Sequence, residues 1–279
     1  MRSPKSQAGG KLALLALIAA VLPWKSAGAQ PDQAAQTFRT ARATALQGGF
    51  AAAATAFTTA AAQAKATRDQ AVEVAAMRGL ADLQELQRPC TDSAQATLRA
   101  ALRVVSPGDR SAPDALVRLL ASRGDVDAAR QILVETYADV PAVGRSITTE
   151  SMRFLQGQAA VQFAGGQESA ALSTLGMALT VAARLRDGDA RDSVASPTGE
   201  VDRVNAWLLF DLAMLRLHAK SPSIRQPATA KAILDRLVAA PASTLDGGEE
   251  EAYPITRIGD RLFLQAHAKG QSLSKRTGC

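Results

Sequence analysis

The sequence predicts an all-α protein of about five antiparallel helix pairs followed by a C-terminal capping helix. Apolar residues recur at three- and four-residue spacing, which places them on one face of a helix. The segments with this spacing are separated by short turns rich in glycine and proline. No segment offers a candidate for a strand, in which apolar and polar residues would alternate.

Residues 1–29 have the features of a cleavable secretory signal peptide. Basic residues precede the apolar run Leu12–Leu22, and the small residues Ala27-Gly28-Ala29 follow where signal peptidase cuts. An uncleaved membrane anchor is the alternative, but the run is about half of the roughly 20 apolar residues that a spanning helix needs. We therefore expect cleavage after Ala29 and a periplasmic or secreted mature chain without a transmembrane span.

The charge balance does not indicate a nucleic-acid partner. The full sequence carries 32 Lys and Arg against 26 Asp and Glu, a net charge of +6. Four of the basic residues and none of the acidic ones precede residue 30, so signal removal leaves a net charge of +2. The high isoelectric point of the precursor is therefore no sign of nucleic-acid binding.

The stretch Ala112–Pro141 is the clearest helix pair. Pro113 suits the first turn of a helix, and Gly124 supplies the permissive backbone that ends it. Asp125 can then cap the second helix, and Pro141 forces the chain out of it. The residues expected on the buried faces of the two helices are Leu116, Leu119, Leu120, Ala129, Ile132, Leu133 and Thr136.

This stretch resembles a tetratricopeptide repeat. A glycine in the turn is followed by a small residue five later, a large one four after that, and a proline eight further on. The same order of a small and a large residue recurs at Ala53 and Phe57, Ala94 and Leu98, Ala171 and Leu175, and Ala230 and Leu234. The resemblance implies a right-handed superhelical stack with a concave groove. It also implies a scaffold for protein or peptide partners in the cell envelope.

The other elements follow in order within a repeat domain of residues 30–268. We expect helices over 32–48 and 51–65, 69–86 and 91–105, 148–164 and 167–185, 201–220 and 227–240, with a capping helix over 249–268. Residues 269–279 form a loose tail. The polar stretch 186–199 interrupts the array as an exposed loop. Its aspartates fail the calcium-loop template, because Arg191 and Asp192 stand where a ligand and a glycine are needed.

The helix 201–220 is apolar on most sides and is expected to be buried between neighbours. Asp211 on it needs a partner, which is either a ligand or a neighbouring helix terminus. A carrier of a small ligand such as a peptide or lipid fragment is an alternative function for the chain. That reading predicts a closed apolar pocket around Trp207 and Phe210.

Residues with a catalytic pattern are scarce. The two histidines, His218 and His267, are isolated, and neither a serine elbow nor a phosphate-binding loop is present. We therefore expect no metal, no cofactor and no catalytic residues. A glycan-cleaving enzyme remains the weakest alternative, and it needs two carboxylates about 5–10 Å apart.

The candidate groove residues come from the first helices of the pairs. They are Arg78, Asp82, Arg153, Gln156, Asn205 and Asp211. Each of them can equally be a surface residue or a polar contact between helices. The two cysteines, Cys90 and Cys279, leave open a disulfide, an intermolecular link or free thiols.

Overall fold

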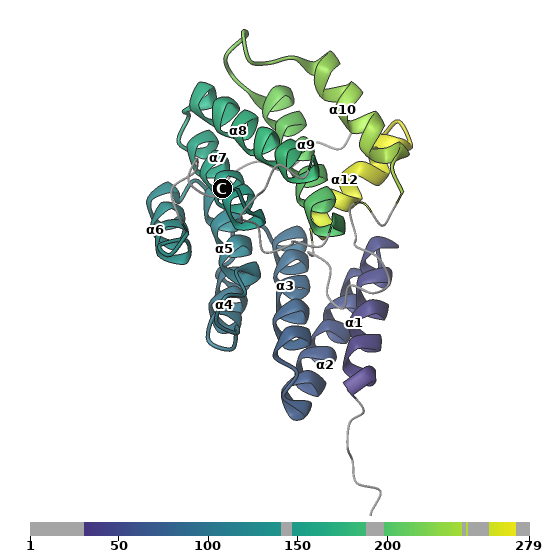
Figure 1. Cartoon of the computed structure of the whole chain (residues 1–279). Helices are drawn as coiled ribbons and strands as arrows, with labels where there is room; N and C mark the ends of the chain where they lie inside the picture. Colours follow the sequence, from purple (N-terminus) through teal and green to yellow (C-terminus); the bar gives the residue numbers. More distant parts are fainter. Residues whose placement is uncertain (1–30, 141–146, 188–197, 242–243, 245–256, 272–279) are drawn as a thin grey trace, which may run out of the picture.

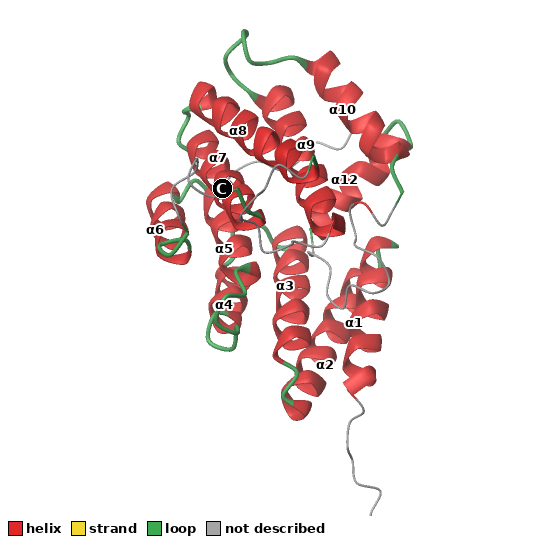
Figure 2. Cartoon of the chain, in the orientation of Figure 1, coloured by secondary structure: helices red, strands yellow, loops and turns green. Residues whose placement is uncertain are grey.

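The computed structural model describes residues 31–140, 147–187, 198–241, 244 and 257–271. Within these ranges the chain forms eleven α-helices and no strand, which confirms the all-α prediction (Figures 1 and 2). The expected signal peptide, most of the expected loop 186–199 and all but three residues of the expected tail lie outside the described residues. These three expectations therefore remain predictions.

The helices occur where the apolar spacing predicts them. The first six are α1 (Pro31–Leu46), α2 (Phe50–Thr67), α3 (Gln70–Gln87), α4 (Asp92–Ala101), α5 (Ser111–Ser122) and α6 (Val126–Thr136). The others are α7 (Thr149–Ala164), α8 (Glu168–Arg186), α9 (Thr198–His218), α10 (Pro227–Ala239) and α12 (Ile258–Ala268). The helix α4 ends before the expected residue 105, because the backbone tightens to three-residue hydrogen bonds at Arg103 and Val104.

Each even-numbered helix from α2 to α8 packs against the helices before and after it, and α10 packs against α9 and α12. The small and large residues predicted for this contact are buried in every pair, from Ala53 and Phe57 in α2 to Ala230 and Leu234 in α10. A small side chain lets the neighbouring helix approach, and the large one fills the space beside it.

The odd-numbered helices form a second row. The helix α3 contacts α1 and α5, α5 contacts α7, and α7 contacts α9. In Figure 1 the helices follow an arc that leads back from α10 through α12 toward α1. We call the face of the α3, α5, α7 and α9 row on which α12 lies the inner face.

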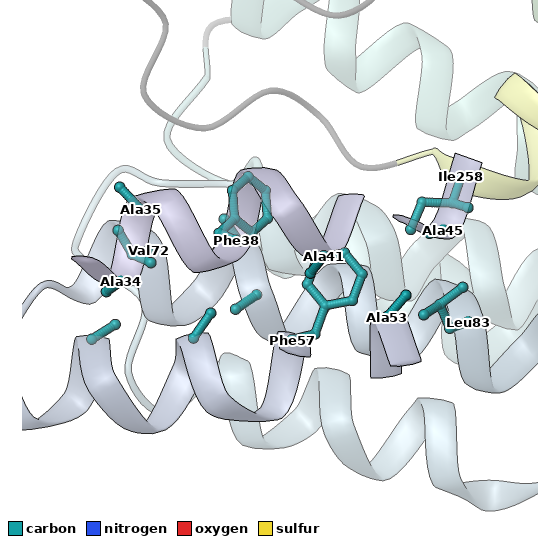
Figure 3. Close-up of a cluster of buried hydrophobic side chains, with 14 residues drawn as sticks. Ala34, Ala35, Phe38, Ala41, Ala45, Ala53, Phe57, Val72, Leu83 and Ile258 are labelled. Carbon is teal, nitrogen blue, oxygen red and sulfur yellow. The ribbon is translucent and has the colours of Figure 1, made fainter. Parts of the chain in front are cut away.

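The C-terminal helix α12 does more than cap the last pair. It packs on α10 as expected, and it also contacts α3 and α1. Its first residue, Ile258, belongs to the buried cluster of α1, α2 and α3 and lies near Ala45 in Figure 3. The backbone N–H of Ile258 donates a hydrogen bond of 3.2 Å to Asp82 Oδ2 on α3. The expected start at residue 249 lies outside the described residues.

The cluster at the N-terminal end is packed tightly around two phenylalanines. The rings of Phe38 and Phe57 lie 5.8 Å apart and are tilted against each other (Figure 3). A Cβ atom on Gly79 of α3 would lie 2.5 Å from Cε1 of Phe57. The glycine therefore sets how closely α3 approaches α2.

Turn geometry follows the sequence with two departures. Gly124 has φ of 81° after α5, as its predicted helix-ending role requires, whereas Cys90 adopts φ of 71° between α3 and α4 without being a glycine. Cys90 is disulfide-bonded, and Cys279 lies outside the described residues. Asp125 stands at the N-cap of α6 as expected, but its side chain makes no capping hydrogen bond.

Candidate functional site

A small cavity lies on the inner face, where α3, α5, α7 and α9 meet the residue that precedes α12. Its volume is about 30 Å³. The residues that line it are Arg78, Ser111, Asp114, Arg118, Arg153, Gln156, Val204, Trp207 and Arg257. Four arginines against one aspartate give the lining an excess of positive charge. Helical geometry explains the gathering, because residues three or four apart in one helix share a face and neighbouring first helices present that face together.

Five of the six predicted groove residues belong to this site or adjoin it. Arg78, Arg153 and Gln156 line the cavity. Gln156 Nε2 donates to Asp211 Oδ2 at 2.5 Å, so Asp211 lies directly behind the lining. Asp82 is one turn beyond Arg78 on α3 and interacts with the charges of Arg78 and Arg118. Asn205 is half-buried on α9 and is not among the lining residues.

Two of the arginines are paired with acids of the chain itself. Arg153 Nη2 lies 2.7 Å from Glu200 Oε1. Arg257 is held by Asp211 and Asp260, each at 2.6 Å, and its guanidinium lies 4.3 Å from the ring centre of Trp207. Burial alone would lower the pKa of Arg257, but the two carboxylates raise it above its ordinary value.

Arg78 and Arg118 have no such partners. Among the residues that the structure describes, neither guanidinium makes a hydrogen bond or an ion pair. Arg78 is only 4% exposed, and its Nε is buried without an acceptor. Burial, and then the charge of Arg118, lower the pKa of Arg78 to about 10. Burial and the charge of Arg257 also lower the pKa of Arg118.

A third unpartnered donor belongs to Trp207. This side chain is 1% exposed, and its Nε1–H has no hydrogen-bond acceptor in the described part of the chain. A buried donor without an acceptor is costly, and most indole N–H groups in protein interiors are paired. Three of the nine lining residues, Arg78, Arg153 and Trp207, thus hold a buried N–H donor without an acceptor among the described residues.

The carboxylates beside the cavity are engaged by fixed donors. The hydroxyl of Tyr137 donates to Asp114 Oδ1 at 2.8 Å, and Asp82 accepts from the backbone of Ile258. Burial raises the pKa of Asp82 to about 6, although the charges of Arg118 and Arg78 oppose this change. Burial likewise raises the pKa of Asp114, against the charge of Arg153 and the hydrogen bond from Tyr137.

Sequence reasoning missed Asp114, Arg118 and Arg257. The signal for the first two was present, because they lie four residues apart on the first helix of the clearest repeat unit, as Arg78 and Asp82 do on α3. Arg257 offered no such signal. The sequence placed it inside a helix that began at residue 249, whereas in the structure it is the N-cap of α12.

Trp207 and Phe210 form a packed cluster. Their rings lie 5.7 Å apart edge to face, and Phe210 packs on Phe263 at 6.0 Å. The cavity beside Trp207 has a lining made mostly of polar side chains. This geometry differs from the closed apolar pocket that a lipid or peptide carrier was expected to have around these rings.

No cluster of His, Cys, Asp and Glu within the described ranges could hold a metal ion. None of the helices that the structure describes is sufficiently long and apolar to span a membrane. Comparison with known proteins identifies no relative: no family model matches the chain, and neither a curated protein nor a solved structure matches it significantly.

Proposed function

We propose that this chain is an exported, non-catalytic helical-repeat protein that binds a protein or peptide partner through its inner face. The proposal includes a right-handed superhelical twist of the helix pairs, as the resemblance of Ala112–Pro141 to a tetratricopeptide repeat implies. It also includes removal of residues 1–29 and a location in the periplasm or outside the cell.

The observation that carries the proposal is the arginine-lined cavity on the inner face. Side chains from four first helices and from Arg257 converge there, and two of its arginines have no acceptor among the described residues. Arginine is enriched at the centres of protein interfaces, where its charge and its planar donor group recognise acidic partners. An acidic segment of a partner fits this surface better than a basic or a neutral one.

The enzyme alternative is less well supported. A glycan-cleaving enzyme needs one carboxylic acid and one carboxylate that both reach the substrate. Asp114 and Asp82 have raised pKa values, but the hydroxyl of Tyr137 and the backbone of Ile258 occupy them. Burial of the two carboxyl groups explains both raised pKa values, so neither value requires a catalytic role.

The test is crosslinking of the mature protein in its native cell envelope, followed by mass spectrometry. We expect a reproducible protein partner that is lost when Arg118→Gln or Arg78→Gln is introduced. The matched control is Arg130→Gln, because Arg130 is an exposed arginine of the outer helix α6. A monomer that retains a small molecule and no protein partner would instead support the carrier alternative.

A further inference from the structure

We propose that the inner-face cavity is a binding site for a single carboxylate group, held by Arg78 and Arg118. This inference rests on the proposed function and deepens it, because it names the chemical group that the partner presents.

The pairing of the arginines divides the lining into fixed and available donors. Glu200 neutralises Arg153, and Asp211 and Asp260 neutralise Arg257. Arg153 and Arg257 therefore line the site, but acids of the chain already compensate their charges. Arg78 and Arg118 carry charges without an ion pair in the described part of the chain, so their fork-shaped donor groups remain free to bind an anion.

The two available arginines also repel each other. Burial makes each charge costly, and the charge of Arg118 is the next cause of the lowered pKa of Arg78. Removing charge from water stabilises a site only when an opposite charge or good hydrogen bonds compensate. A carboxylate between the two guanidinium groups provides both, and it would raise the pKa of Arg78 and Arg118 together.

Neutral groups complete a lining that suits an acidic side chain or chain end. Ser111 opens α5, so its hydroxyl and the positive end of that helix adjoin the cavity. The indole N–H of Trp207 is a further buried donor without an acceptor in the described chain. Val204 and the ring of Trp207 offer apolar surface to the carbon atoms that carry the carboxylate.

The size of the cavity favours a carboxylate over a phosphate. A volume of about 30 Å³ accommodates about two water molecules by the same measure. A carboxylate has two oxygens in one plane, which the planar donor forks of arginine match in geometry. A phosphate carries four oxygens in a tetrahedron and needs more room.

The experiment is an NMR titration of the ¹⁵N-labelled mature chain with acetate at neutral pH and constant ionic strength. The side-chain N–H resonances of Arg78, Arg118 and Trp207 report on the site directly. We expect these resonances to shift in a saturable manner with acetate and to remain unchanged with acetamide, which has the same shape without the charge. Arg118→Lys keeps the charge but loses the donor fork, and it should weaken acetate binding at least tenfold. Arg130→Lys should leave the affinity unchanged.

Three related compounds identify the source of the group. N-acetylglutamate amide presents a side-chain carboxylate, N-acetylalanine presents a chain end, and acetate represents a free small acid. Tighter binding of one of them supports the site and names its source. Inorganic phosphate that binds more tightly than all three would overturn the assignment to a carboxylate. A response to acetate that does not saturate, or that is equal in Arg118→Lys, would overturn the site.

The outcome is separable from that of the crosslinking experiment. If acetate binds but partner capture does not depend on Arg118, the site stands and the proposed function fails. If partner capture depends on Arg118 but neither acetate nor the two peptide analogues bind, the proposed function stands and the carboxylate site is wrong. The comparison of acetate with acetamide on the wild-type protein needs no variant. It therefore tests the carboxylate site even if a substitution impairs folding.

Discussion

Arg257 Nη2 lies 2.6 Å from Asp211 Oδ1, and this contact joins the residue before α12 to the middle of α9. The guanidinium also lies 4.3 Å from the ring centre of Trp207, so it is held by charge on one side and by an aromatic face on another. Asp211 accepts a second hydrogen bond from Gln156 on α7. One buried arginine thus connects the C-terminal segment to two helices of the inner face.

Arg257→Gln should destabilise the protein by about 3 kcal/mol, because it leaves the carboxylates of Asp211 and Asp260 without their cation. The measurement is the free energy of unfolding from urea denaturation. Arg130→Gln is the matched control. Its ion pair with Asp127 is exposed on both sides, and such pairs contribute less than about 1 kcal/mol.

The double variant with Asp211→Asn tests whether the pair accounts for the loss. Its destabilisation should be clearly smaller than the sum of the two single losses, because each single change already removes the same contact. If the double variant instead loses the full sum of the two single losses, the pairing of Arg257 with Asp211 contributes little. Arg257 would then stabilise the fold through Trp207 and Asp260.

Gly79→Ala should destabilise the protein by about 1–3 kcal/mol, although alanine is the better helix former. The added Cβ would lie 2.5 Å from the buried ring of Phe57, so α3 or the ring has to move. Gly176→Ala on α8 is the matched control. A Cβ there meets no atom within 4 Å, so this change should be neutral or stabilise by up to about 1 kcal/mol. Thermal denaturation of the two variants side by side measures the difference, and equal effects would contradict the proposed close approach of α3 to α2.

The helices and their buried faces could be predicted from the sequence because their signals are local. The three- and four-residue spacing of Leu116, Leu119 and Leu120 and the small residue Ala129 act within one pair, and all four are buried. The same reasoning selected Arg78, Arg153 and Gln156, since polar residues on first helices of the pairs face the same side.

The position of α12 could not be predicted, because it depends on contacts between distant parts of the chain. Ile258 and Asp82 meet across 176 positions of the sequence, and Arg257 meets Asp211 across 46. No periodicity encodes such a contact. For the same reason the sequence predicts only a helix that caps the last pair. In the structure α12 also contacts α3, and Arg257 before it completes the lining of the cavity.

If residues 1–29 are removed as a signal peptide, the mature chain should begin at Gln30. The described structure begins at Pro31 with α1, so cleavage there leaves the first helix intact. N-terminal sequencing and the intact mass of the protein purified from its native cells check this prediction. Ala29→Leu places a large residue where signal peptidase needs a small one, and the uncleaved precursor should then accumulate. Full retention of residues 1–29 in the wild-type protein would instead indicate a membrane anchor.

Asp82 should make the stability of the fold depend on pH between about pH 4 and pH 6. Burial raises the pKa of this carboxyl to about 6 from its ordinary value of 3.8, and the charge of Asp260 adds to the shift. The charges of Arg118 and Arg78 and the N–H of Ile258 oppose it without cancelling it. In this pH window the folded chain binds more protons than the unfolded chain, so stability falls as the pH rises. The full loss, reached above pH 6, is about 3 kcal/mol at most.

Asp82→Asn removes this titration, because the amide stays neutral at every pH. The free energy of unfolding of the variant relative to the wild type should therefore increase as the pH rises from 4 to 7. Urea denaturation at a series of pH values measures this difference. A relative stability of Asp82→Asn that decreases over the same range would show the opposite sign. The charges of Arg78 and Arg118 would then outweigh burial at Asp82, and the inner face would already hold its own counter-charge.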